Sequence, residues 1–242
     1  MNEYNRPNSY GFQGTRSRVT MEQYLAKTFL WMVAGLGVTF VTASMFSRAL
    51  AQPAFFRVVA GIPGFHLLLA VAEMVIVWNL SGKLGSMSTG TATGMFFLYA
   101  VINGLTFASI LFVYDMSTVL FAFLSAGVYF GVMAAYGYLA RKDLTSWGRM
   151  ISCGLIAMLI VNLLGMFFGF GAFERLISTV GIVLFLCITA YDTQRIKRYY
   201  NFWASDPGML HKASVYGALQ LYLDFINIFL YILRMAASRR DD

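Results

Sequence analysis

Apolar residues along this chain come in long runs separated by short clusters of charge. Five runs hold at most one charged residue each: residues 28–47, 58–82, 150–173, 176–194 and 213–233. A helix needs roughly 20 mostly apolar residues to cross a bilayer. Each of these runs therefore predicts one membrane span.

The longest apolar run, residues 84–140, holds only Asp115 and is too long for one crossing. It divides around Asp115 into two spans joined by a very short turn. The runs do not alternate between apolar and polar positions, as the strands of a membrane barrel would. The sequence thus predicts an all-α integral membrane protein with seven transmembrane helices, near residues 25–47, 61–81, 91–113, 117–139, 150–170, 176–195 and 213–235.

Composition supports a lipid environment. Of the 242 residues, 59% are hydrophobic and 12% are charged, whereas soluble domains carry about 25% charged residues. The length suits one transmembrane domain over residues 21–236. A flexible cytoplasmic tail over residues 1–20 and a short polar tail over residues 237–242 are expected to flank it.

The net charge of +7 comes from basic residues at the ends of the apolar runs. Such residues set topology and contact lipid headgroups, so no nucleic-acid partner is predicted. An N-terminus on the inner side gives twelve Lys and Arg residues inside and six outside, which favours a cytoplasmic N-terminus. The basic C-terminal tail fits this count poorly, and a re-entrant last helix would bring the tail back to the inner side.

Glycines recur at helical spacing in three of the spans, in the pairs Gly90 and Gly94, Gly127 and Gly131, and Gly165 and Gly169. Pairs at this spacing let membrane helices approach closely. We expect them to serve packing within the chain and not contact with a second copy.

Three carboxylic acids fall inside predicted spans: Glu73, Asp192 and Asp224. An ionised acid in mid-membrane costs about 2.5–3.5 kcal/mol on insertion scales, so such residues face the bundle interior and often mark an ion or proton path. The alternative is a neutral acid that makes a structural hydrogen bond.

The last span carries a polar stripe. Gln220, Asp224, Asn227, Tyr231 and Arg234 follow one another at intervals of four, three, four and three residues, which places them on one helix face. A polar stripe on an apolar helix must face protein or water. The span is therefore predicted to be central, with Gln220, Asn227 and Tyr231 as candidates to line an ion path together with Glu73.

Asp192 and Asp224 lie on consecutive spans, which are usually neighbours. Two carboxyl groups in contact cannot both ionise cheaply, so they would share a proton and titrate as a pair. Such a pair predicts a pH sensor, and when ionised it offers oxygen ligands to calcium. Cys153 and Cys187 show no metal-site spacing, and no cofactor is expected.

Three segments resemble the Bax inhibitor-1 family of seven-helix membrane proteins. They are GALQLYLDFINIFL at residues 217–230, AYDTQ at residues 190–194, and residues 138–145 at the end of the fourth span. The similarity runs from about Thr20 to Arg234 and is greatest to short bacterial members, which implies a multi-pass protein of the bacterial inner membrane.

This resemblance implies a seven-helix fold with a central last helix and a calcium leak governed by pH. It assigns the sensor to Asp192 and Asp224 and the acid of the second span to Glu73. Some bacterial relatives latch the sixth-span aspartate with an arginine. Here Lys83 and Arg195 are the candidates for that role.

Two other functions fit parts of the sequence. Some bacterial relatives bind a membrane-anchored protease, so a regulator that binds such a partner without transport is the alternative. An intramembrane aspartyl protease would carry Gly-x-Gly before its second aspartate, where this chain has Leu221-Tyr222-Leu223. The protein is therefore not expected to be an enzyme.

Overall fold

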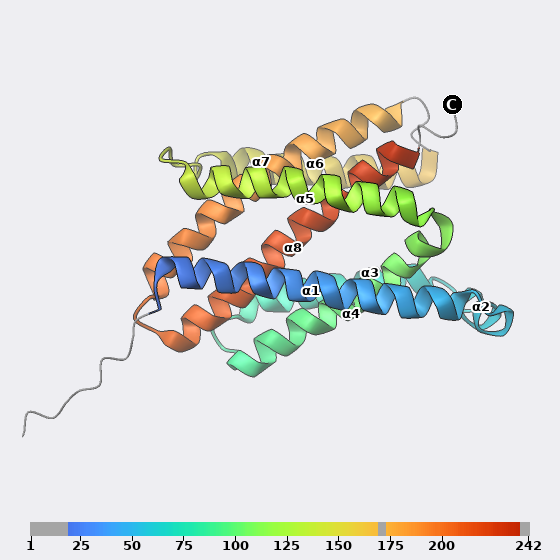
Figure 1. The fold of residues 1–242 in the computed structure, drawn as a ribbon, viewed down its shortest axis with the longest axis horizontal. Helices are drawn as coiled ribbons and strands as arrows, with labels where there is room; N and C mark the ends of the chain where they lie inside the picture. Colours follow the sequence, from blue (N-terminus) through green and yellow to red (C-terminus); the bar gives the residue numbers. More distant parts are fainter. Residues whose placement is uncertain (1–18, 169–172, 238–242) are drawn as a thin grey trace, which may run out of the picture.

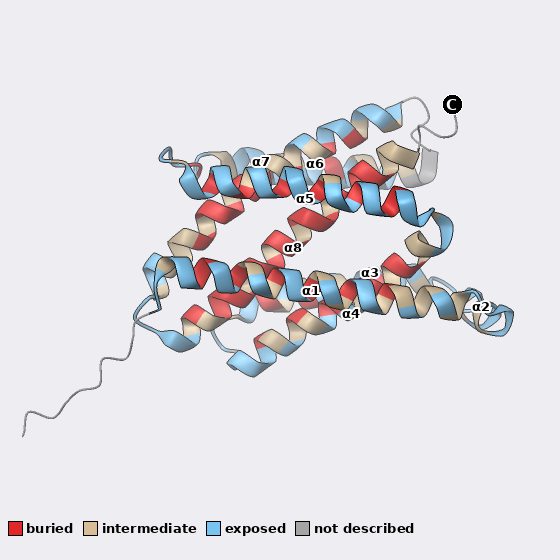
Figure 2. Cartoon of the chain, in the orientation of Figure 1, coloured by how far each residue is buried: buried red, intermediate tan, exposed pale blue. Residues whose placement is uncertain are grey.

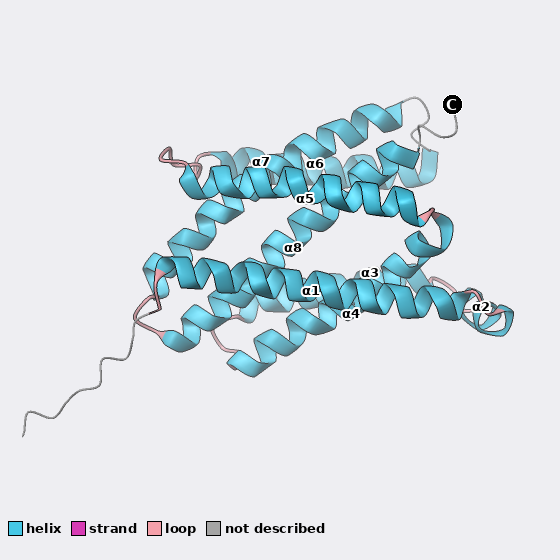
Figure 3. Cartoon of the chain, viewed as in Figure 1, coloured by secondary structure: helices cyan, strands magenta, loops and turns pink. Residues whose placement is uncertain are grey.

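The computed structural model describes residues 19–168 and 173–237. Within them the chain forms helices and no strands (Figure 3). The predicted tails lie outside the described residues, apart from residues 19, 20 and 237. The helices are α1 (Met21–Leu50), α2 (Pro53–Ala60), α3 (Phe65–Lys83), α4 (Thr89–Val113), α5 (Met116–Leu139), α6 (Trp147–Phe168), α7 (Glu174–Trp203) and α8 (Pro207–Ala237).

Seven of these helices are long and apolar enough to cross a membrane, which confirms an all-α membrane protein with seven spans. The prediction omitted α2, a short helix that begins at Pro53 and buries none of its residues. The prediction also ended α7 at residue 195 and began α8 at residue 213. Both helices continue into the polar α7–α8 connection, because helix formation does not stop where hydrophobicity does.

The helices form two groups with α8 between them (Figure 1). One group contains α1, α3 and α4, and the other contains α5, α6 and α7. Of the residues in the most apolar part of α8, 78% are buried, compared with 11% in α6 (Figure 2). The central position predicted for the last span is confirmed, since α8 contacts α1, α4, α5 and α7.

α8 is one continuous helix of 31 residues, about 46 Å long at 1.5 Å per residue. It is therefore long enough to cross a bilayer completely. Its two ends define two sides of the bundle, the α7–α8 loop side, where α1 begins, and the C-terminal side, where α1 ends (Figure 1).

The predicted role of the glycine pairs is wrong where the structure describes it. Among the described residues, nothing lies within 4 Å of the Cβ that Gly94, Gly127 or Gly131 would gain. Gly169 is not among the described residues. The close approaches occur elsewhere, since a Cβ at Gly137 of α5 would collide with the backbone of Ala190 of α7. Spacing alone did not show which face of each helix meets a neighbour.

Hydrogen bonds tie α8 to the first group of helices. The hydroxyl of Tyr222 lies 2.6 Å from the hydroxyl of Thr39 on α1 and donates to Oδ1 of Asn103 on α4 at 2.9 Å. All three side chains are buried. On the other side, the ring of Phe225 packs against Phe123 and Phe130 of α5. These contacts fix the rotation of α8 and so decide which way Asp224 points.

Candidate functional site

Asp192 and Asp224 lie well inside α7 and α8, on the sides where these helices meet. Their side chains are nearly enclosed, with exposed fractions of 7% and 3%, and they are close enough to interact electrostatically. Oδ2 of Asp224 is buried and has no hydrogen-bond partner among the described residues. Two negative charges here would repel each other with little water to screen them, so the packed arrangement does not suit a doubly ionised pair.

Two arginines lie beyond Asp192 on α7. Arg195 and Arg198 are one and two turns further along the helix, half-buried, and both attract the charge of Asp192. Neither forms an ion pair with it within the described residues. Arg195 lies over the ring of Tyr199, 5.5 Å from the ring centre. The arginines therefore make the α7–α8 loop side of the pair electropositive.

The polar stripe of α8 coincides with the least buried edge of that helix. Gln220, Asn227 and Arg234 are half-buried, whereas Asp224 and Tyr231, at the margin of the stripe, are buried. This edge lies between the faces that α4 and α7 cover. Nδ2 of Asn227 donates only to the carbonyl of its own helix at Leu223, and Oε1 of Gln220 has no partner among the described residues.

Polar groups that protein atoms leave unsatisfied in a membrane span need water or an ion. The stripe therefore presents polar groups along α8 on the edge that is least covered by protein.

Asn162 of α6 was not identified as a site residue, yet it meets the C-terminal end of the stripe. Its Nδ2 donates to the hydroxyl of Tyr231 at 3.0 Å, and its Oδ1 accepts from Nη1 of Arg234 at 3.3 Å. A lone asparagine in the apolar run 150–173 was the signal available in the sequence.

Glu73 lies apart from the pair. It accepts a hydrogen bond at 3.0 Å from Thr106 of α4 and interacts with Asn103 and Tyr222. Since Tyr222 and Asp224 point to opposite faces of α8, the structure places Glu73 with the α1–α4 group, across the helix from Asp224.

Lys83 is exposed at the end of α3 and forms no ion pair with Asp192 in the described structure. The loop that follows Lys83 is held instead by Lys212, a buried side chain near the start of α8. Its Nζ donates to the carbonyls of Gly85 and Met87 at 3.0 and 3.1 Å. The α3–α4 loop is thus attached directly to α8.

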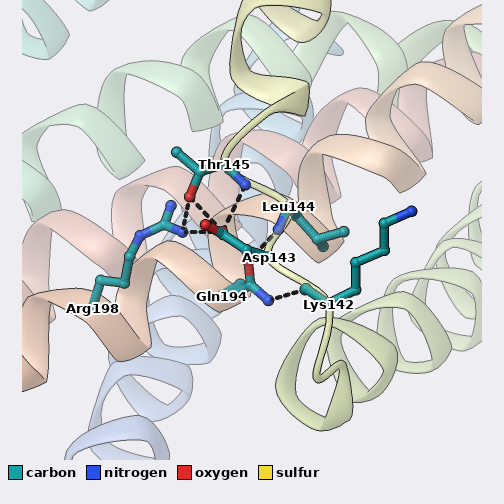
Figure 4. Close-up of polar contacts among 6 residues, drawn as sticks. All are labelled: Lys142, Asp143, Leu144, Thr145, Gln194 and Arg198. Carbon is teal, nitrogen blue, oxygen red and sulfur yellow. Dashed lines mark hydrogen bonds and ion pairs between the residues drawn. The ribbon is translucent and has the colours of Figure 1, made fainter.

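The loop between α5 and α6 is clamped to α7 (Figure 4). Gln194 accepts from the backbone N–H of Leu144 at 2.8 Å and donates to the carbonyl of Lys142 at 2.9 Å. Nη1 of Arg198 lies 3.3 Å from Oδ1 of Asp143 and 2.6 Å from the hydroxyl of Thr145. Two segments that the family resemblance rested on, residues 138–145 and 190–194, therefore meet in space.

Asp143 is exposed, and hydrogen bonds stabilise its charged form. The hydroxyl and the backbone N–H of Thr145 donate to its carboxylate, and these bonds, with the charge of Arg198, lower the pKa of Asp143. Asp143 is consequently charged at neutral pH.

No group of three or more His, Cys, Asp or Glu residues that could hold a metal is present in the described residues. Calcium takes six to eight oxygen ligands. An ion that passes the pair would therefore need water, backbone carbonyls or the amides of Gln220 and Asn227 as further ligands.

Comparison with known proteins agrees with this architecture. The family described as "Inhibitor of apoptosis-promoting Bax1" matches residues 21–241. The chain belongs to the Bax inhibitor-1 family. The match spans all seven membrane helices, both aspartates and the clamped loop.

Bacterial relatives in the Bax inhibitor-1 family match over nearly their full length. Inner membrane protein YbhL of Escherichia coli K12 is 34% identical over 226 residues, which cover 92% of this chain and 94% of the relative. Uncharacterized proteins of Borreliella burgdorferi and Deinococcus radiodurans are each 35% identical, over 221 and 220 residues. The first pairing covers 91% and 94% of the two chains, and the second covers 89% and 90%.

Proposed function

We propose that this protein is a calcium-leak channel of the bacterial inner membrane, and that the protonation of Asp192 and Asp224 sets how much calcium passes. The observation that carries the proposal is the burial of two interacting carboxyl groups on adjacent membrane helices, beside a polar stripe that runs along α8. In this proposal the protein needs no cofactor and catalyses no reaction.

The packed arrangement corresponds to a closed state, because Asp224 is almost fully enclosed. Proton loss from the pair would add charge where the helices touch. Repulsion between the carboxylates would loosen the contact of α7 with α8, while the added charge would attract a divalent cation. Both effects link passage of calcium to pH through the same two side chains.

Purified protein in liposomes tests the proposal, with calcium flux measured from pH 5 to pH 8. Asparagine carries no charge at any pH. The double variant Asp192→Asn/Asp224→Asn should therefore show, at every pH, the leak that the unchanged protein shows at its acidic limit. Asp224→Asn and Asp192→Asn alone should each lose the part of the pH response that comes from repulsion within the pair. Glu73→Gln is the matched control, since it removes an acid from a span on the other side of α8 and should keep the pH response.

A leak that keeps its full pH dependence in both aspartate variants would refute the sensor. A purified protein that passes no calcium at any pH would refute the channel. That second result would favour the alternative, in which the protein binds and regulates a membrane-anchored protease or another membrane partner, and crosslinking in native membranes would then identify that partner.

We also propose that the N-terminus faces the cytoplasm, since this orientation places most Lys and Arg residues inside. In a variant that lacks Cys153 and Cys187, single cysteines introduced at residues 27 and 57 should then react with an impermeant thiol reagent from opposite sides of the membrane, with residue 57 accessible from outside. Labelling in the reverse sense would overturn the orientation.

A further inference from the structure

α5 and α7 touch near the loop side of the bundle and diverge toward the C-terminal side. At the near end, Gly137 of α5 packs directly on the backbone of Ala190 of α7. Toward the other end the two helices separate (Figure 1), and a groove of about 710 Å³ lies between them, lined also by the last turns of α8. This volume is within the range of small-molecule sites, roughly 300–1,000 Å³.

The groove has the depth of one bilayer leaflet. Its α5 side is formed by residues one turn apart, Ser117, Phe121, Ser125 and Tyr129. From Ser117 to Tyr129 the helix advances about 18 Å at 1.5 Å per residue. The hydrocarbon core of a bilayer is about 30 Å thick, so one leaflet supplies about 15 Å. Because α5 begins at Met116, the groove runs from the membrane surface on the C-terminal side to about the middle of the bilayer.

The groove opens sideways toward lipid. Phe121, Tyr129 and Val183 line it and have exposed fractions of 61%, 50% and 56%. They lie on helices long and apolar enough to cross the membrane, so their exposed surfaces face acyl chains. A lipid chain can therefore enter the groove from the bilayer without crossing protein or water.

A buried hydroxyl lies at the surface end of the groove. Thr118, in the first turn of α5, lines the groove with an exposed fraction of only 7%. Its hydroxyl makes no hydrogen bond in the described structure, whereas Thr179, across the groove on α7, donates to a carbonyl of its own helix at 2.8 Å. A buried hydroxyl without a partner is unfavourable, so the occupant of the groove should bring an acceptor to Thr118. The ester carbonyls of a phospholipid are acceptors, and they lie where the headgroups meet the hydrocarbon.

We propose that this groove binds one acyl chain of a phospholipid from the leaflet on the C-terminal side, with an ester carbonyl at Thr118 and the end of the chain near Tyr129. The chain completes the packing of α5, α7 and α8 where the helices diverge. A helix of a second copy fits less well. Membrane helices pack closely through small residues, whereas aromatic rings form the edge of this groove, and the groove ends halfway across the membrane that a helix would span.

Photolabelling tests the proposal. Purified full-length protein in detergent micelles is titrated with a phosphatidylethanolamine that carries a photoreactive diazirine on one acyl chain, and mass spectrometry locates the attached lipid after illumination. Labelling should saturate at one lipid per protein. A diazirine next to the ester should label residues 117–121, and one at the chain end should label the segments around Tyr129 and Leu186.

Two tryptophan variants on α5 show whether the groove itself is occupied. Ser125→Trp fills the groove and should abolish the saturable labelling. Leu124→Trp is the matched control, since Leu124 has an exposed fraction of 59% and does not line the groove, and it should label as the unchanged protein does. Thr118→Val keeps the shape of the side chain and removes its donor. It should raise the half-saturating lipid concentration about fivefold, the value of about one net hydrogen bond, and it decides the question if Ser125→Trp does not fold.

Labelling that never saturates and spreads evenly over the lipid-facing helices would overturn the proposal. Equal labelling of the two tryptophan variants, or equal half-saturation for Thr118→Val and the unchanged protein, would also overturn it. Crosslinks that join two copies of the chain through the groove would assign the groove to a second copy instead. None of these measurements depends on calcium flux, so the lipid site and the channel can fail separately.

Discussion

Replacement of Gly137 by alanine should destabilise the bundle by about 3 kcal/mol. The added Cβ would lie 2.8 and 2.9 Å from Cα and the carbonyl carbon of Ala190, and closer still to the carbonyl oxygen. Non-bonded carbon atoms prefer about 3.5–4.0 Å, and both sides of this contact are backbone, so α5 and α7 must separate by roughly 1 Å. Insertion of a methyl group into a packed core costs about 1–3 kcal/mol, and the rigidity on both sides puts Gly137 at the upper end.

Thermal unfolding in detergent provides the assay. For a chain of 150–250 residues, about 3 kcal/mol lowers the melting temperature by about 6–12 °C. Gly131→Ala is the matched control on the same helix, where nothing in the described structure lies within 4 Å of the new Cβ. There alanine should be neutral or stabilise by up to about 1 kcal/mol, because it favours the helix over glycine. If Gly137→Ala melts at or above the temperature of Gly131→Ala, the close approach of α5 and α7 is wrong.

Three further outcomes are expected. Gln194→Ala should destabilise the protein by about 2–4 kcal/mol, because it removes two hydrogen bonds and leaves the buried N–H of Leu144 unpaired; thermal unfolding measures it. Lys212→Met should cost about 3 kcal/mol by the loss of two bonds from a charged group, whereas Lys83→Met should stay within about 0.5 kcal/mol. Asp143→Asn should speed hydrogen exchange in residues 141–146 at pH 7. The pKa of Asp143 is lowered in the folded protein, so in the unchanged protein this loop should stay docked above about pH 4, the ordinary pKa, and become open to pepsin only below it.

Each of these outcomes has a contrary result. Equal melting temperatures for Gln194→Ala and the unchanged protein would mean that water replaces the amide at the loop. Equal effects of the two lysine substitutions would show that Lys212 does not hold the α3–α4 loop. A loop that opens to pepsin already at pH 6 would contradict the lowered pKa of Asp143.

The membrane spans could be predicted because charge is costly in lipid, so the charged residues mark the ends of the spans. That Asp192 and Asp224 lie close enough to interact electrostatically was expected because they are on consecutive spans. By contrast, α2 contains an arginine and is too short to span, so a search for long apolar runs passed over it. Helical spacing grouped Gly127 with Gly131 correctly on one face but could not show that this face has no neighbour.

Contacts between distant segments could not be predicted either, because spacing along one helix does not show which side chains of other helices it meets. Nothing in the run that contains Asn162 indicates that it meets Tyr231, 69 residues later. Gln194 was noted as part of a family segment, but its bonds to the backbone of residues 142 and 144 depend on how a loop folds back. Sequence spacing describes one helix at a time, and these bonds join separate elements.

The place of α8 between the two groups of helices has a consequence for biosynthesis. Of the described helices, α8 is the last to leave the ribosome, so the α1–α4 and α5–α7 halves enter the membrane before the helix that joins them exists. During that interval Thr39 and Asn103 lack their hydrogen bonds to Tyr222. Asp192 likewise lacks its interaction with Asp224. A chain stopped before residue 207 would leave the two groups of helices without α8 between them and with these polar groups unpaired, which is an intermediate prone to aggregation.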